Sequence, residues 1–142
     1  MGYTKNRELR NTWSYWLQEQ EFNTAIHLQW NFWSKSQKAN RSYLTNTISS
    51  SQPTFAERYQ IVSGFWITEQ NRSGSGYHSH MLCTTSLPPH IIEQSERVKG
   101  ANCRAESIGD IQPVSFYVTK WIDGYDIVDY DLFGMIHSAE MP

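Results

Sequence analysis

YQIVSGFWITEQNRSGSGYHSHMLCTT, residues 59–85, contains two runs of strand-forming residues separated by a short polar loop. Residues 59–70 and 77–85 are rich in β-branched and aromatic side chains, which favour strands. Residues 71–76 have the glycine and serine density of a hairpin loop. We therefore expect an antiparallel hairpin here, and the remaining segments are interpreted as its neighbours.

Outside the hairpin, the chain alternates between helical and strand-like patterns. Apolar residues spaced by three and four predict helices, and strict alternation predicts strands. Pro88 and Pro89 fit the first turn of one helix. Asp110 fits the N-cap of another helix, and Gly124 fits its C-terminal end. On these grounds we expect helices within residues 7–20, 35–49, 88–98 and 110–123, strands at 22–33 and 102–108, and a loop at 49–54.

This order of elements predicts one α+β domain covering residues 1–142. We expect a central antiparallel β-sheet flanked by helices, all of them on one side, similar to the ferredoxin-like sheet of RRM domains. The hydrophobic fraction of 39% and the six tryptophans argue against a disordered chain. No apolar run approaches the roughly 20 residues that cross a bilayer, and residues 1–10 lack the apolar core of a signal peptide. Cys83 and Cys103 are too far apart for a CxxC motif and fit free thiols in a reducing compartment, so we expect a cytoplasmic protein with no membrane partner.

The charged residues are distributed unevenly. The net charge is −2, yet all twelve basic residues lie at or before Lys120, together with nine of the fourteen acidic ones, a balance of +3. The segment from about residue 123 is an acidic tail, and such a tail is usually a solvated face. The body of the chain is compatible with a modest phosphate-binding surface whose strength depends on salt.

His78 and His80 are two of only five histidines in the chain. Residues i and i+2 of a strand face the same way, so these imidazoles share one face and Ser79 faces the other. Neutral imidazole is a common metal ligand, and two on one face make half a site. The alternative is that both belong to an exposed polar face of the sheet.

A carboxylate joins the pair if the hairpin closes symmetrically. Glu69 then lies opposite His78, and Ile67 lies opposite His80. Two imidazoles and one carboxylate suit a divalent ion such as Mg²⁺ or Mn²⁺ and leave open positions for substrate oxygen. A one-residue slip would move Glu69 to the other face, where it would be a solvent-facing residue near the hairpin tip.

SFYVTKWI, residues 115–122, provides a second chemical group. On a helix Tyr117 and Lys120 are three apart and share a face. A tyrosine phenol can act as a covalent nucleophile, and a neighbouring ammonium can hold or neutralise phosphate. A tyrosine three residues before a lysine also arises by chance, in which case Tyr117 serves packing, as we expect for Phe116, Val118 and Trp121.

Together, GFWITEQ, YHSHML and FYVTKWI resemble the motifs of the HUH endonucleases, and more narrowly those of single-tyrosine rolling-circle replication initiator (Rep) proteins of plasmids or viruses. The resemblance runs from about Phe22 to Ile122. It implies that His78, His80 and Glu69 bind Mn²⁺ or Mg²⁺, that Tyr117 is the catalytic nucleophile and that Lys120 is its accessory lysine. The first Rep motif should lie near residues 24–30, where the match is loose and no residue is assigned a contact. Ser79 also differs from the hydrophobic residue that the family prefers at this position.

The resemblance further implies a DNA-nicking and joining enzyme that initiates rolling-circle replication. Its substrate would be single-stranded DNA of a replication origin or hairpin, cut to give a 5′-phosphotyrosine and a free 3′-hydroxyl. The chain has no helicase domain, so host helicase and polymerase are expected partners, and a second nick would need regenerated enzyme or a transient homo-oligomer. Trp30, Trp33 and Tyr77 could stack on unpaired bases, although each fits core packing as well.

Three other functions fit the same residues. A single-tyrosine HUH transposase shares ligands and nucleophile and differs in the fate of the DNA ends. A non-catalytic nucleic-acid-binding domain would use a similar sheet without the chemistry. A metal-dependent phosphodiesterase would attack with metal-activated water and leave Tyr117 structural.

Overall fold

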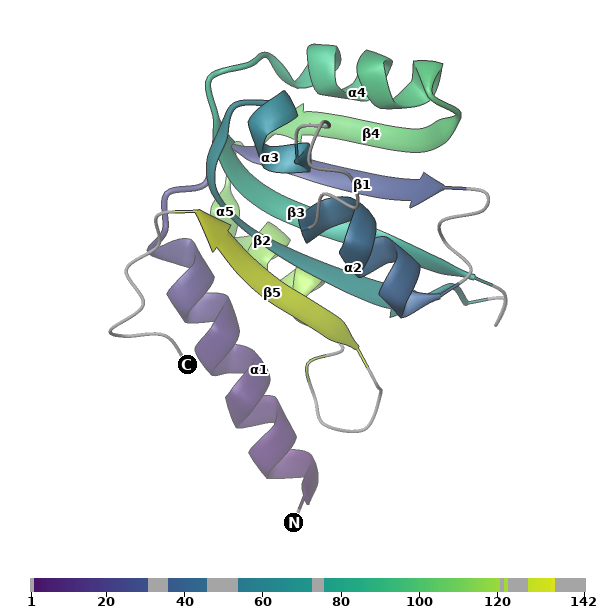
Figure 1. The fold of residues 1–142 in the computed structure, drawn as a ribbon. Coiled ribbons are helices and arrows are strands. Elements are labelled where there is room, and N and C mark those ends of the chain that lie inside the picture. Colours follow the sequence, from purple (N-terminus) through teal and green to yellow (C-terminus); the bar gives the residue numbers. More distant parts are fainter. Residues whose placement is uncertain are drawn as a thin grey trace.

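The computed structural model of the protein describes residues 2–30, 36–45, 54–72, 76–120, 122 and 128–134. These residues form an α+β domain with a five-stranded antiparallel sheet of strand order β4-β1-β3-β2-β5 (Figure 1). The central antiparallel sheet that the sequence predicts is thus confirmed. The elements, in chain order, are α1 (Gly2–Gln18), β1 (Thr24–Trp30), α2 (Gln37–Thr45), α3 (Phe55–Arg58), β2 (Ile61–Gln70), β3 (Tyr77–Thr85), α4 (Pro89–Val98), β4 (Ala101–Ser107), α5 (Ile111–Val118) and β5 (Asp129–Gly134).

The β2–β3 hairpin has the register expected from its symmetric closure. Glu69 lies opposite His78, and Ile67 lies opposite His80. The only irregularity in this pairing lies at the far end of the hairpin, between Ile61 and Ser63. Because side chains alternate along a strand, this register puts Glu69, His78 and His80 on one face of the sheet.

Helices cover both faces of the sheet, so the expectation that they lie on one side is wrong. In Figure 1, α2 and α3 lie in front of the sheet and α5 lies behind it. The buried run Phe65–Trp66–Ile67 of β2 supplies side chains to both faces and needs cover on each. One core packs residues of α2, α3 and α4 against Trp66, Met81 and Ile26, and the other packs α1 and α5 against Phe65, Ile67 and Leu82.

The helix of residues 110–123 is shorter in the structure than its apolar pattern predicts. The Asp110 side chain caps its start by accepting a hydrogen bond from the Gln112 backbone amide, as expected. The helix ends at Val118, and Lys120 lies in the turn that follows, where its amide donates to the Tyr117 carbonyl at 3.4 Å. Trp121 and Gly124, expected as core residue and stop, lie outside the described residues.

Part of the acidic tail is folded rather than solvated, which corrects its interpretation as a solvated face. Residues 129–134 form the edge strand β5, paired with β2. The Arg41 guanidinium of α2 donates to both carboxylate oxygens of Asp129, at 2.6 and 2.9 Å, and to Asp131 at 3.0 Å. The sequence did not predict β5, because aspartate is uncommon in strands. The residue that pairs with Asp129 and Asp131 is Arg41, which is about 90 residues earlier in the chain. The short helix α3 was missed too, and its capping box at Thr54 and Glu57 was the available signal.

The opposite edge of the sheet is covered by side chains of α4. The Glu93 carboxylate accepts a hydrogen bond from the Ala105 amide at 3.0 Å, and Arg97 donates one to the Cys103 carbonyl at 2.9 Å. These bonds satisfy edge groups of β4 that another strand would otherwise pair. In the described part of the chain, no helix has the length and apolar character to span a membrane.

Candidate metal centre

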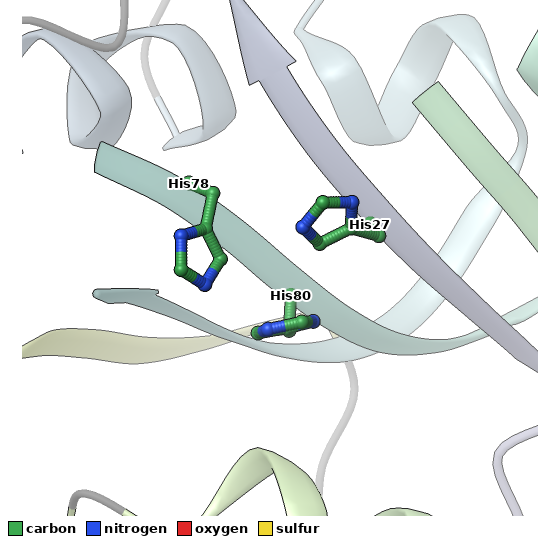
Figure 2. Close-up of side chains that lie close together, drawn as sticks. All are labelled: His27, His78 and His80. Atoms are coloured by element: carbon green, nitrogen blue, oxygen red, sulfur yellow. The ribbon is translucent and has the colours of Figure 1, made fainter. Parts of the chain in front are cut away.

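Three adjacent strands bring four potential metal ligands to one face of the sheet. On β3, His78 and His80 are separated by one residue; β2 places Glu69 opposite His78, and β1 places His27 opposite His80. Figure 2 shows the three imidazoles gathered over the sheet, two from β3 and one from β1. The face is the one that α1 and α5 cover, because Ile67 and Leu82, two residues from Glu69 and His80, belong to that core.

The three imidazoles lie close enough to share one ion. Their ring centroids are 4.9 Å apart for His27 and His80, 5.0 Å for His78 and His80, and 5.3 Å for His27 and His78. One nitrogen from each ring lies within 4.8 Å of the others. The cluster could therefore hold a metal ion.

Glu69 lies beneath this cluster and is 1% exposed. Its Oε1 atom is 3.1 Å from His78 Nε2 and 3.3 Å from His80 Nε2. Burial by itself would raise the pKa of the Glu69 carboxyl. Its contacts with His78 and His80, with the charge of Lys120 further out, outweigh that effect and lower the pKa to about 2. Glu69 is therefore a carboxylate at neutral pH and offers only acceptor atoms.

The hydrogen bond of Asn71 orients the His78 ring. The Asn71 side-chain oxygen lies 2.7 Å from His78 Nδ1, so Nδ1 carries the proton and donates. Nε2 then faces Glu69: in the protonated ring it donates to the carboxylate, and in the neutral ring it presents a lone pair that a metal ion can use. Two acceptors facing one another at 3.1 Å are compatible with a positive charge between them, a proton or a metal ion.

Two buried atoms of the cluster lack a hydrogen-bond partner among the described residues. They are His80 Nε2, whose 3.3 Å contact with Glu69 lacks hydrogen-bond geometry, and Glu69 Oε2. An unpaired buried polar atom is unfavourable, and a metal ion bound through Glu69 Oε1 and His80 Nε2 would satisfy the His80 nitrogen. With bonds of about 2.1 Å, neighbouring ligands on one octahedral ion are about 3.0 Å apart, close to the observed distances of 3.1 and 3.3 Å. The donors therefore fit a divalent ion without large movement.

The imidazole of His27 is suited to act as a neutral ligand. Burial and, to a smaller extent, the charges of His80, His78 and Arg104 lower its pKa to about 4, against a smaller opposing effect of Glu69. Arg104 lies directly opposite His27 on β4. His27 is thus unprotonated at neutral pH, as a metal ligand must be.

Tyr117 of α5 lies beside the histidines. Its ring packs edge-on against the His80 ring, with centroids 5.4 Å apart, and is 54% exposed. The Lys120 ammonium lies 3.8 Å from the centre of the Tyr117 ring. An exposed phenol and an ammonium therefore lie next to the candidate ligands, although α5 ends between them.

A groove of about 670 Å³ extends from this cluster toward the β4 edge of the sheet. Its lining includes His27, His80 and Tyr117 at one end, and Asn102, Arg104 and Glu106 of β4. The three β4 residues are exposed and alternate along the strand, so they share the face of His27. The groove therefore has polar side chains along its length and reaches His27 and His80.

The structure brings together all five residues that the sequence suggested for metal binding and catalysis: His78, His80, Glu69, Tyr117 and Lys120. Tyr77, suggested for base stacking, alternates with His78 and shares the opposite face with Ser79 and Met81. The Trp30 side chain and Trp33 lie outside the described part of the chain.

His27 was missed by sequence reasoning. The strand that contains His27 was predicted, and its alternating pattern puts His27 and Ile26 on different faces. Nothing in the local sequence indicated that this strand, β1, pairs with β3. That pairing joins segments more than 50 residues apart, and only a search for a histidine on every strand would have suggested it.

Comparisons of the chain with protein-family models, curated proteins and solved structures find no match.

Proposed function

We propose that this protein is a metal-dependent enzyme that nicks and joins single-stranded DNA through a covalent tyrosine intermediate, as HUH endonucleases do. His78, His80 and Glu69 hold a divalent ion, and Tyr117 is the nucleophile. The proposal includes the initiation of rolling-circle replication as the role of the nick.

One observation carries the proposal: an exposed tyrosine packs against a histidine of a metal-ligand cluster. Tyr117 is 54% exposed although its ring contacts His80, which is 7% exposed. A phenol that attacks a phosphate needs both access to the substrate and proximity to the metal.

The reaction is a transesterification at one phosphodiester. The Tyr117 oxygen attacks the phosphorus in line, the bond to the 3′ oxygen breaks, and the downstream strand becomes linked through its 5′ phosphate. The phenol proton passes to water, and the leaving 3′ oxygen takes a proton from water. A divalent ion supplies Lewis-acid stabilisation of charge on the phosphate when bound. Lys120 adds a second positive charge on the same side, and the reverse attack by the 3′-hydroxyl rejoins the strand.

The groove beside the cluster offers room for the rest of the DNA strand. An unpaired strand has to reach Tyr117 in extended form, and the groove leads from Tyr117 and His80 across β1 to Arg104. Arg104 is a phosphate-binding group in this arrangement. Glu106 at the β4 edge would repel phosphate and limits the positive stretch to the neighbourhood of the histidines.

The proposal is tested by trapping the intermediate. The protein is incubated with Mn²⁺ and a random pool of single-stranded oligonucleotides labelled at either the 5′ or the 3′ end, then separated on a denaturing protein gel. We expect label on the protein from 3′-labelled strands alone, since these retain the segment downstream of the 5′-phosphotyrosine. Mass spectrometry of the adduct should identify the peptide that contains Tyr117.

Tyr117→Phe should abolish both cleavage and adduct while leaving DNA and Mn²⁺ binding nearly unchanged. Tyr15→Phe is the matched control, because Tyr15 of α1 is 56% exposed and also contacts an aromatic ring. Cleavage without an adduct, retained by Tyr117→Phe, would contradict the proposal and identify hydrolysis by a metal-activated water.

A further inference from the structure

We propose that His27 is a fourth protein ligand of the metal, so that three imidazoles and one carboxylate select an ion of the Mn²⁺ or Zn²⁺ class over Mg²⁺. This inference rests on the metal site of the proposed function and extends it, because that site needs only His78, His80 and Glu69.

Strand pairing holds His27 in a suitable place. It lies directly opposite His80 across β1 and β3, as Glu69 lies opposite His78 across β3 and β2. The cluster therefore has a ligand on each side of the central strand. Rigid neighbouring strands position such groups more accurately than loops do.

The distances are compatible with a shared ion after side-chain rotation. Ligands on opposite sides of one octahedral ion are about 4.2 Å apart when each bond is about 2.1 Å, and ligands at right angles are about 3.0 Å apart. The nitrogens of His27, His78 and His80 lie within 4.8 Å of one another, and Glu69 Oε1 lies 3.1 and 3.3 Å from the nitrogens of His78 and His80. Side-chain rotation therefore has to bring the His27 nitrogen closer to the other donors.

The His27 ring is also available as a ligand. It has ring contacts with His78 and His80, but no hydrogen bond holds it elsewhere in the described part of the chain. The His27 ring is half-buried and lines the groove. It can therefore reach an ion by side-chain rotation, with no change in the backbone of β1.

The donor set determines which ion is preferred. Mg²⁺ favours oxygen ligands and keeps several waters, whereas imidazole suits Zn²⁺ and other transition ions. Three nitrogens and one oxygen therefore disfavour Mg²⁺. On a six-coordinate ion, four protein ligands leave two positions, enough for one phosphate oxygen and one water.

The first test is direct. Zn²⁺, which is diamagnetic, is added to ¹⁵N-labelled protein and the imidazole nitrogens are followed by NMR. With one equivalent of Zn²⁺ we expect shifts at three histidines, and in His27→Gln at His78 and His80 only. Shifts at only two histidines of the unsubstituted protein would overturn the proposal.

Calorimetric titrations with Mn²⁺ and Mg²⁺ separate a ligand from a merely structural residue. His27→Gln replaces an imidazole, which transition ions prefer, and should lower the ratio of Mn²⁺ to Mg²⁺ affinity by at least about tenfold. Loss of an outer-sphere partner alone already weakens metal sites by about 10–100-fold, so the effect of a lost ligand should be at least this large. A folding defect would weaken both ions together, and an unchanged ratio would overturn the proposal. His90→Gln, at an exposed histidine of α4, is the control and should change neither affinity.

These results are independent of the adduct assay. If His27 proves not to bind metal while the Tyr117 adduct forms, the four-ligand site fails and the proposed function stands. If Zn²⁺ shifts three imidazoles and no adduct forms with any strand, the metal site stands and the nicking activity fails.

Discussion

The guanidinium of Arg104 lies across from His27 on the neighbouring strand β4. In the described residues it forms no ion pair, and its positive charge helps to lower the pKa of His27. Because His27 is neutral at neutral pH, the Arg104 charge has no ion-pair partner among the described residues, and a bound anion would neutralise it. Arg104 therefore suits a phosphate of the single-stranded DNA in the proposed function.

Replacing Arg104 by Gln should weaken binding of single-stranded DNA by about fivefold near 0.1 M salt. One fewer phosphate contact should also reduce the slope of log affinity against log salt by about 0.7. The measurement is fluorescence anisotropy with a labelled oligonucleotide at several salt concentrations, in Mn²⁺.

Lys38→Gln removes one positive charge from an exposed position on α2 and serves as the control. It should leave the salt slope unchanged, because α2 packs on the face of the sheet opposite the histidines. An Arg104→Gln variant with the slope of the unsubstituted protein would exclude a phosphate contact at this residue.

At the scale of elements, a fully buried carboxylate joins three helices on the face opposite the histidines. Glu96 of α4 is 0% exposed and accepts hydrogen bonds from the hydroxyl groups of Tyr43 of α2, at 2.5 Å, and of Tyr59. Arg58 of α3 and Lys99 lie 3.7 and 3.5 Å from the same carboxylate. Burial and the bonds to Glu96 raise the pKa of both tyrosines, so both hydroxyls remain protonated donors. Every group in this network has a partner, as a buried charge requires.

Glu96→Gln should destabilise the fold by about 2–3 kcal/mol. Each hydrogen bond to a charged group contributes about 1.5–3 kcal/mol, and Gln retains one acceptor oxygen for only part of the network. For a chain of this size the melting temperature should fall by roughly 6–12 °C, measured by circular dichroism.

The same substitution at exposed Glu19 near the end of α1 should change stability by less than about 0.5 kcal/mol. Equal melting temperatures for Glu96→Gln and the unsubstituted protein would show that the network does not stabilise the helices. The metal affinity of Glu96→Gln should be unchanged, since the sheet lies between Glu96 and the histidines.

At the scale of the whole molecule, the candidate metal centre crosses the middle of the sheet. Its ligands come from β1, β3 and β2, the three inner strands of the order β4-β1-β3-β2-β5. Without an ion, the buried atoms Glu69 Oε2 and His80 Nε2 have no hydrogen-bond partner in the part of the chain that the structure describes. An ion bound by these ligands would satisfy His80 Nε2 and link side chains of three strands, which would stabilise the fold.

Mn²⁺ should raise the melting temperature of the protein. A ligand that binds only the folded state adds about 2.7 kcal/mol at a concentration one hundred times its dissociation constant. For this chain length, that corresponds to roughly 8–11 °C, measured by differential scanning fluorimetry with and without EDTA.

His80→Ala should remove this Mn²⁺-dependent shift, whereas His90→Ala should retain it. The comparison is made within each variant, so an effect of the substitution on the metal-free fold does not enter the result. A shift of full size in His80→Ala would mean that Mn²⁺ binds elsewhere on the protein.

Local sequence determined much of this structure. The hairpin at residues 59–85, its register, the two strands beside it and the long helices follow from side-chain preference and from alternation or helical spacing, both short-range properties. The register of the hairpin also follows from its loop, so the proximity of Glu69, His78 and His80 was predictable. The position of Tyr117 beside them was expected only from the resemblance to HUH endonucleases.

Tertiary structure alone decided the rest. Which strand lies beside β3, which faces are covered, and where the acidic segment at residues 129–134 pairs all depend on contacts between distant segments. His27 became part of the histidine cluster because β1 lies between β4 and β3 in the sheet. Asp129 and Asp131 are favourable in β5 because Arg41, on the separate helix α2, pairs with both. Such long-range pairings are set by the burial of two cores and by charge pairing in three dimensions, for which neither spacing nor composition carries a signal.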